Sequence, residues 1–326
     1  MSLSVFLFIL PVKAQDVVIY TSVDQIFSEP VLRAYEKQTG VNVKTVFDVE
    51  AAKTTGLVNR LIAEKKRPKC DVFWNGEIGK TIVLKEKGVL LPYQSPSAKD
   101  IPDLFVDKEY YWTGFGARAR VLIYNTKMLS EADLPKSILE LTQAKWQGKV
   151  AMAYPLFGTT ATHVAAMYQA MGEEKTKKYL ADLKANDLVM VDGNSVVRDI
   201  VVEGKVPIGF TDTDDANVAI QSGRPVKMIY PDRGGIGTLL IPNTVALIKN
   251  APHEDQGKRL IDYLLSREVE SRLSYCESAQ MPVRRGVKTP AHVPEYTSIT
   301  PMKVNYYKIA IDMKPAAKFC RHLFIR

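Results

Sequence analysis

Strand-like and helix-like segments alternate along nearly the whole chain. Short apolar runs are followed by stretches of helical periodicity, starting with a strand, a polar turn, a helix and a second strand over residues 16–47. This alternation is typical of parallel sheets that are covered by helices. We therefore expect an α/β protein in which each central sheet is flanked by helices.

The periodicity predicts the individual elements. The expected short strands are 16–20, 41–47, 71–75, 149–154, 188–193, 207–212 and 226–230. The expected helices are 26–40, 54–67, 77–88, 137–143, 164–172, 194–205 and 214–223, two more over 253–276, and one in the last 25 residues. Gly88 ends its helix in the way that is usual for glycine.

Two long extended segments, 114–127 and 237–249, lie far apart in the sequence. They predict two crossings between two lobes, with residues 16–118 plus 244–326 in lobe one and 119–243 in lobe two. A chain of 326 residues is large enough for two cores of about 150 residues each. We expect a cleft between the lobes.

The N-terminus resembles an export signal. Residues 1–14 hold an apolar stretch from Ser4 to Val12 and end in small residues, although no Lys or Arg precedes the stretch. The stretch is too short to span a membrane, and no cysteine stands near for lipid attachment. The alternative is an apolar first strand of a cytosolic protein.

Charge and composition restrict the function classes. The net charge of +8 is spread along helices without a basic stripe and interleaved aromatic residues, so we expect no nucleic-acid partner. No G-x-S-x-G, H-E-x-x-H or Walker motif is present, and we expect no enzyme. Cys70, Cys276 and Cys320 lack metal or redox spacing, which leaves either one disulfide or small buried apolar side chains.

Ligands of open α/β sheets bind beyond the carboxyl ends of the strands, at helix N-termini. This rule selects polar residues in several separate loops. The candidates are Ser22, Asp24, Asn75, Glu77, Thr159, Thr160, Asn194, Ser195 and the loop 211–215.

Two of these loops favour an anion. The sequences GTTAT (158–162) and GNS (193–195) place small polar residues where unpaired backbone N–H groups and the helix dipole attract negative charge. Phosphate, phosphonate, carboxylate or carbonate would suit them. The alternative is ordinary N-capping of two helices.

The loop after strand 207–212 favours a cation. Asp212, Asp214 and Asp215, with Thr213 between them, repel one another unless a metal ion or an ammonium group neutralises them. One of the three carboxylates is expected to cap helix 214–222, and a solvated acidic helix start is the alternative. Arg118 and Arg120 alternate on segment 114–127, so they share one face and either clamp an anion in the cleft or point to solvent.

The order and spacing of several motifs resemble one family over nearly all of residues 16–326. These motifs are VVIYTSVD, CDVFWNGEIGK, GARARVLIYNTK, KWQGKVAMAYP, GNSVVRDIVVEGKVPIGFTDTDDA, LLIPNTVALIKNAPH and MPVRRGV. The chain is similar to the solute-binding proteins of bacterial ABC importers, and among them to the ferric-iron-binding branch. The resemblance implies a two-lobed, type II-like periplasmic-binding-protein fold and a monomer that delivers its solute to an inner-membrane ABC permease. It also implies no resident cofactor, with Fe³⁺ and carbonate or phosphate as cargo.

The chain departs from that branch at one place. The resemblance leads us to expect a pair of neighbouring tyrosines just after strand 207–212, but Thr213, Asp214 and Asp215 stand there. Carboxylates are hard oxygen ligands and still suit a hard cation. The cargo is therefore expected to be either ferric iron with a synergistic anion or a phosphonate, sugar phosphate or other small anionic or zwitterionic solute. An extracytoplasmic enzyme that acts on an anionic substrate is the third alternative.

Overall fold

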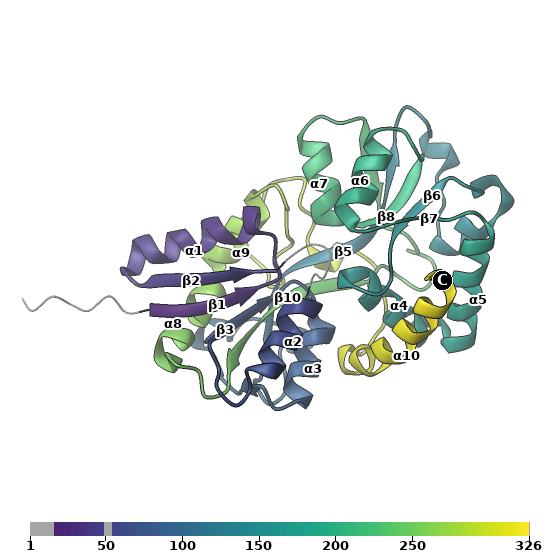
Figure 1. Ribbon diagram of the computed structural model, residues 1–326. Helices are drawn as coiled ribbons and strands as arrows, with labels where there is room; N and C mark the ends of the chain where they lie inside the picture. The colour runs from purple at the N-terminus through teal and green to yellow at the C-terminus, as the bar shows by residue number, and fades with distance from the viewer. Residues whose placement is uncertain (1–15, 49–53, 326) are drawn as a thin grey trace, which may run out of the picture.

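The chain forms two sheets that share one long strand (Figure 1). The structure is a computed structural model and describes residues 16–48 and 54–325, so the predicted leader lies outside the described residues. The hydrogen-bonded strand order is β2-β1-β3-β10-β5-β8-β6-β7, with β4 beside β10 and β9 beside β5. The predicted α/β class is confirmed.

The strands match the expected segments closely. Their bounds are β1 Asp16–Thr21, β2 Asn42–Phe47, β3 Val72–Asn75, β4 Leu90–Leu91, β5 Thr113–Asn125, β6 Val150–Ala153, β7 Val189–Val191, β8 Ile208–Asp212, β9 Val226–Ile229 and β10 Leu240–Ile248. The helices are α1 Gln25–Thr39, α2 Thr55–Ala63, α3 Ile78–Glu86, α4 Gly158–Met171, α5 Glu173–Ala185, α6 Asn194–Val202, α7 Thr213–Gln221, α8 Glu254–Leu264, α9 Arg267–Tyr275 and α10 Tyr306–Phe324.

The half built on β1 to β4 is called lobe one here. Strands β1, β2 and β3 run parallel, and β10 joins β3 in the antiparallel direction. Both sheet faces are buried: Trp74 packs in the core under α1, α8 and α9, whereas its neighbour Phe73 packs in the core under α2 and α3. Alternating side chains on a strand point to opposite faces, which explains why Val72, Phe73 and Trp74 of β3 are all apolar.

The half built on β6 to β9 is called lobe two. Helices α4 and α5 cover one face of its sheet, and α6 and α7 cover the other (Figure 1). The predicted helix 137–143 is wrong in type, because Ile138–Thr142 forms only a short 3-10 helix. Its two buried residues, Ile138 and Leu141, are three positions apart, and a 3-10 turn suffices to place them on one side.

The two predicted crossings are confirmed as β5 and β10, which pair with each other between the lobes. Their register shifts between Pro242 and Asn243, where the pairing skips Gly116 on β5. Gly116 has φ +49°, and a Cβ there would lie 2.9 Å from the Gln280 side-chain oxygen. Glycine at this bulge therefore lets the strand bend where the two lobes join.

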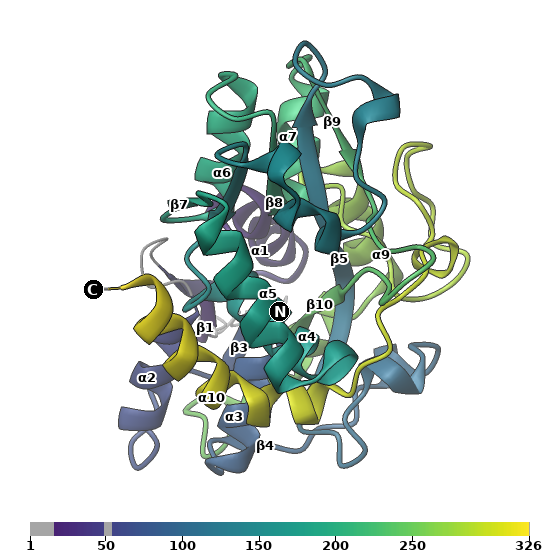
Figure 2. The ribbon, with the colours of Figure 1, turned by 90° about the vertical axis from the view of Figure 1, so that its right-hand side faces the viewer.

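The C-terminal helix packs against both lobes. Figure 2 shows α10 between α3 on one side and α4 and α5 on the other. Its assignment to lobe one, like the boundaries 118/119 and 243/244, stays a prediction. No described helix is long and apolar enough to cross a membrane.

The three cysteines are unpaired in the structure. Cys70 and Cys320 are fully buried, and Cys276 is partly buried. This agrees with the expectation of small apolar side chains rather than a disulfide.

Candidate functional site

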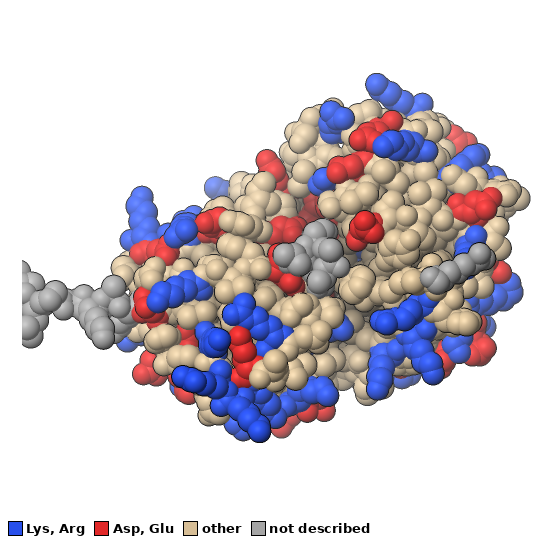
Figure 3. Space-filling model, viewed as in Figure 1, with Lys and Arg blue, Asp and Glu red and all other residues tan. Residues whose placement is uncertain are grey.

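The predicted ligand loops converge on one cleft between the lobes. Its cavity measures about 560 Å³ with the open mouth included, and Arg118 of the shared strand β5 forms part of its wall. Nine of the thirteen predicted site residues line it: Ser22, Glu77, Arg118, Thr159, Thr160, Asn194, Asp212, Asp214 and Asp215. Acidic side chains are visible in the hollow between the two halves in Figure 3.

The other four predicted residues, Asp24, Asn75, Ser195 and Thr213, lie outside the cavity wall. Asn75 is fully buried, where it accepts a hydrogen bond from Ser22 Oγ at 2.6 Å and donates to Thr81 Oγ1 at 2.9 Å. The Thr213 hydroxyl accepts from the backbone N–H of Ala119 at 3.1 Å. These two side chains hold the surrounding backbone in place.

Sequence reasoning missed several residues of the wall. They are Thr54, Ala153, Tyr154, Phe157 and Asp192, whereas Gly76, Gly158 and Gly193 belong to the loops that the sequence had selected. Tyr154 directly follows β6, so the carboxyl-end rule would have selected it. Thr54 precedes α2 with φ +72°, and no sequence signal points to it.

The three aspartates form a compact cluster on lobe two. One carboxylate oxygen from each of Asp212, Asp214 and Asp215 lies within 4.8 Å of the others. Asp212 occupies the N-cap position of α7, but its side chain does not cap the helix, so the predicted capping role is wrong for this carboxylate. Its oxygens instead accept hydrogen bonds from Arg120, from Thr159 and from the side-chain amide of Asn194 at the start of α6.

Three arginines face these carboxylates. Arg120 Nη1 donates to Asp212 Oδ1 at 2.8 Å, Arg118 Nη1 donates to Asp214 Oδ2 at 3.1 Å, and Arg198 Nη1 lies 3.7 Å from Asp215 Oδ1. Arg118 and Arg120 are both buried and both bind these carboxylates, but Arg118 lines the cavity whereas Arg120 lies behind it. Their role as anion clamps stays a prediction. The alternative of solvated arginines is wrong.

The charges of this cluster stabilise one another. Burial alone would raise the pKa of Asp212, but the positive charges of Arg120 and Arg118 outweigh it and keep the pKa below its usual value. Burial would likewise lower the pKa of Arg118, and Asp214 and Asp212 more than reverse the effect. Both partners therefore stay ionised at neutral pH.

The N-termini of α4 and α6 belong to the same network. Thr159 Oγ1 donates to Asp212 Oδ2 at 2.5 Å, Asn194 Nδ2 donates to Thr159 Oγ1 at 2.8 Å, and Thr160 Oγ1 donates to Asn194 Oδ1 at 3.2 Å. The N-cap residues are Phe157 and Gly193, and neither gives its helix a side-chain cap. The alternative of ordinary N-capping by the predicted residues is therefore wrong.

Lobe one contributes polar groups that are already engaged. Ser22 Oγ accepts from the Gly76 N–H at 2.9 Å, and the Gly76 carbonyl accepts from Arg118 Nη2. Glu77 caps α3, because its two carboxylate oxygens accept from the N–H groups of Gly79 and Lys80 at 2.8 Å each. Burial raises the pKa of Glu77 above its usual value, against the opposing effects of Lys80 and these donors.

The site offers oxygen ligands for a hard cation and N–H donors for an anion, side by side. Aspartate oxygens suit Fe³⁺, Mg²⁺ or an ammonium group. Two helix N-termini and Arg118 suit an oxyanion. A ligand with both characters would fit the charge pattern best.

Comparison with known proteins agrees with this geometry. The family model described as bacterial extracellular solute-binding protein matches residues 31–301. The major ferric iron-binding protein of Neisseria meningitidis serogroup A is 25% identical over 269 residues, which are 79% of this chain and 78% of that protein. A provisionally named 2-aminoethylphosphonate-binding periplasmic protein of Salmonella typhimurium is 29% identical over 260 residues, 78% of this chain and 73% of that protein.

Solved structures share the fold. Iron-bound HitA from Pseudomonas aeruginosa superposes with a TM-score of 0.86 at 22% identity, over 95% of this chain and 100% of that one. The predicted two-lobed fold is confirmed by this likeness. The family match covers most of the chain, and the protein therefore belongs to the bacterial extracellular solute-binding proteins.

Proposed function

We propose that this chain is the periplasmic solute-binding component of an ABC importer. Family membership and a cleft whose wall comes from both lobes support this role. The chain binds its solute between the lobes, closes by bending at β5 and β10, and delivers the solute to an inner-membrane permease. It acts as a monomer and makes or breaks no bond.

The proposed cargo is ferric iron together with an oxyanion such as carbonate or phosphate. One observation carries this: three carboxylate oxygens within 4.8 Å of one another lie beside two helix N-termini that have no side-chain cap. Asp212, Asp214 and Asp215 supply hard ligands for the metal. The relative from Neisseria, a ferric iron-binding protein by name, supports the same cargo.

The anion is required by the charge of the site. Arg118, Arg120 and Arg198 already offset much of the negative charge of the three aspartates. A bare trivalent ion would therefore meet little net attraction, whereas an oxyanion on Arg118 and the helix N-termini restores it. Carbonate or phosphate would then complete the coordination of the metal beside the carboxylates.

A thermal-shift titration with iron-free protein tests the cargo. Ferric citrate, and ferric iron with carbonate or phosphate, should raise the melting temperature, because a ligand at about 100 times its dissociation constant adds roughly 2.7 kcal/mol of stability. An Asp212→Asn, Asp214→Asn double variant should lose this gain. If neither iron form stabilises the unaltered protein, the iron proposal is wrong.

A zwitterionic phosphonate is the second candidate. The pattern of Arg118 beside Asp214, next to the start of α4, suits a phosphonate and an ammonium group on one small molecule, and the Salmonella relative carries that solute in its name. Calorimetry with 2-aminoethylphosphonate distinguishes the two. Heat of binding with the phosphonate and none with ferric iron would replace the first candidate by the second.

A further inference from the structure

One hydrogen bond joins the two lobes between a residue of the cavity wall and a residue behind it. Thr162 Oγ1, on α4 of lobe two, donates to Glu77 Oε2, at the start of α3 in lobe one, at 2.9 Å. Thr162 is fully buried and Glu77 is nearly so. The bond therefore forms in a dry interface where a charged acceptor strengthens it.

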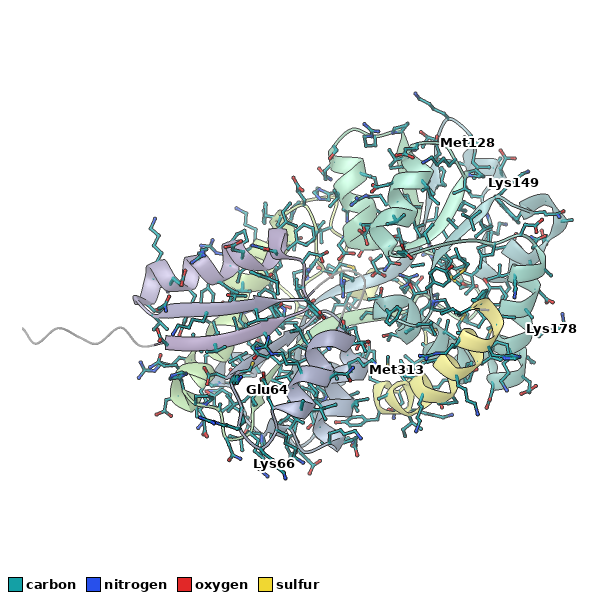
Figure 4. The ribbon with its side chains drawn as sticks, in the orientation of Figure 1. Glu64, Lys66, Met128, Lys149, Lys178 and Met313 are labelled. Carbon is teal, nitrogen blue, oxygen red and sulfur yellow. The ribbon has the colours of Figure 1, made fainter. Side chains whose placement is uncertain are left out.

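A second contact involves the same turn of α3. Met313 of α10 packs so closely over Gly79 that a Cβ on Gly79 would lie 2.5 Å from the Met313 sulfur. Figure 4 shows Met313 on the side of α10 that faces the helices of lobe one. The turn of α3 that begins with Glu77 is thus contacted by both α4 and α10.

Helix α10 is also fastened to lobe two. The side chains of Ala316 and Cys320 lie in the core that α4 and α5 share. Gln169 of α4 exchanges two hydrogen bonds with the Asn305 backbone, at 3.1 Å from Nε2 to the carbonyl and 3.0 Å from the N–H to Oε1. Helix α10 also contacts lobe one, because the Tyr307 hydroxyl donates to Asp107 and accepts from Lys85 of α3. An opening of the cleft must therefore break contacts of α10 with one of the lobes as well as the bond from Thr162.

We propose that the first turn of α3 is an interlobe clasp, in which Thr162 and Met313 hold Glu77 and Gly79 and so set how readily the empty cleft opens. The proposal rests on the proposed function only in that a solute receptor must open and close. Thr162 itself does not line the cavity, and it reaches the wall through its bond to Glu77.

The clasp can open without leaving buried groups unpaired. Thr162 Oγ1 also lies 3.3 Å from the Gly158 carbonyl oxygen, one helical turn back, which can accept its proton when the lobes part. Glu77 keeps its two backbone donors in α3. Opening therefore costs the bond from Thr162 to Glu77 together with apolar contacts that α4 and α10 make with α3, which a bound or released solute can offset.

The test compares solute-free variants by small-angle X-ray scattering and by hydrogen exchange at the first turn of α3. Thr162→Val removes the hydroxyl but keeps the shape, and the ratio of closed to open protein should fall about tenfold, which corresponds to 1.4 kcal/mol. The radius of gyration should rise and exchange at Gly79 and Lys80 should accelerate. Met313→Ala should act in the same direction.

Two further variants serve as controls. Thr162→Ser keeps the donor and should restore the closed form. Thr176→Val removes another buried hydroxyl, on α5, which donates to the Gly172 carbonyl within lobe two. Equal scattering and exchange for Thr162→Val and Thr176→Val would overturn the proposal. Because no solute is added, a failed cargo screen leaves this result unaffected, and a failed clasp leaves the cargo question as it stands.

Discussion

The two walls of the cleft use their polar side chains differently. In lobe one, Ser22 and Glu77 are occupied by the backbone of their own loop and helix. In lobe two, the aspartates, arginines and two helix N-termini form one charged network that faces the cavity. The difference indicates that lobe two recognises the charge of the solute, whereas lobe one covers it.

The largest effect is expected when the network of lobe two is broken. Arg120→Met leaves the buried Asp212 carboxylate with Arg118, at 3.9 Å, as its one remaining cationic partner among the described residues. An unpaired buried charge costs about 3–5 kcal/mol, so the free energy of unfolding in urea should fall by that amount. The double variant Arg120→Met, Asp212→Asn should recover most of it.

A matched change in lobe one provides the contrast. Arg272 and Glu268 form an exposed pair on α9. Such pairs contribute less than about 1 kcal/mol, so Arg272→Met should hardly change the urea midpoint. Equal losses for the two arginine variants would contradict the claim that the Arg120–Asp212 pair is buried and costly to break.

Acid should destabilise lobe two first. His163 on α4 is buried, and burial together with the charge of Arg120 lowers its pKa to about 3 from the usual 6.5. The neutral ring thus contributes stability that is complete above pH 6.5 and is lost as the pH falls toward 3, because only the unfolded chain takes up the proton.

Between pH 7 and pH 5 this loss amounts to about 2 kcal/mol. Hydrogen exchange should show the sheet of lobe two opening before that of lobe one at pH 5. His163→Gln should flatten the pH dependence, while His322→Gln, an exposed control, should preserve it. A pH dependence that survives His163→Gln would refute the assignment.

Cargo binding should depend more on the lobe-two wall of the cleft than on the lobe-one wall. Asp214→Asn removes a charge that faces the cavity and should weaken binding about tenfold, or roughly 1.4 kcal/mol. Ser22→Ala removes a hydroxyl that serves the lobe-one loop and should weaken it less than about threefold. Calorimetry with the confirmed cargo measures the affinity of both variants. A larger loss for Ser22→Ala than for Asp214→Asn would show that lobe one recognises the solute.

The sequence predicted which loops form the site better than which side chains face it. Asp212 and Thr159 were found because the carboxyl ends of parallel strands meet at one edge, a rule that depends only on strand order. Ser195 follows Asn194 on a helix, where successive side chains point about 100° apart, so only one of the two faces the cavity.

Other features depend on tertiary contacts and left no local signal. Asn75 stands at the expected place, but its side chain is hydrogen-bonded to Ser22 and Thr81 instead of facing the cavity. The C-terminal helix was expected to cover one lobe, yet its apolar residues pack against both, since Ile309 lies in one core and Cys320 in another. Periodicity predicts a buried helix face but does not name its partner.

Anomalous X-ray diffraction at the iron absorption edge, on crystals of the protein loaded with ferric iron and phosphate, tests the central claim most directly. The account predicts one iron peak in the cleft, in contact with the carboxylates of Asp212, Asp214 and Asp215, with phosphate between the metal and the start of α4. An iron peak confined to the outer surface, or a cleft without metal beside fully ion-paired aspartates, would contradict it.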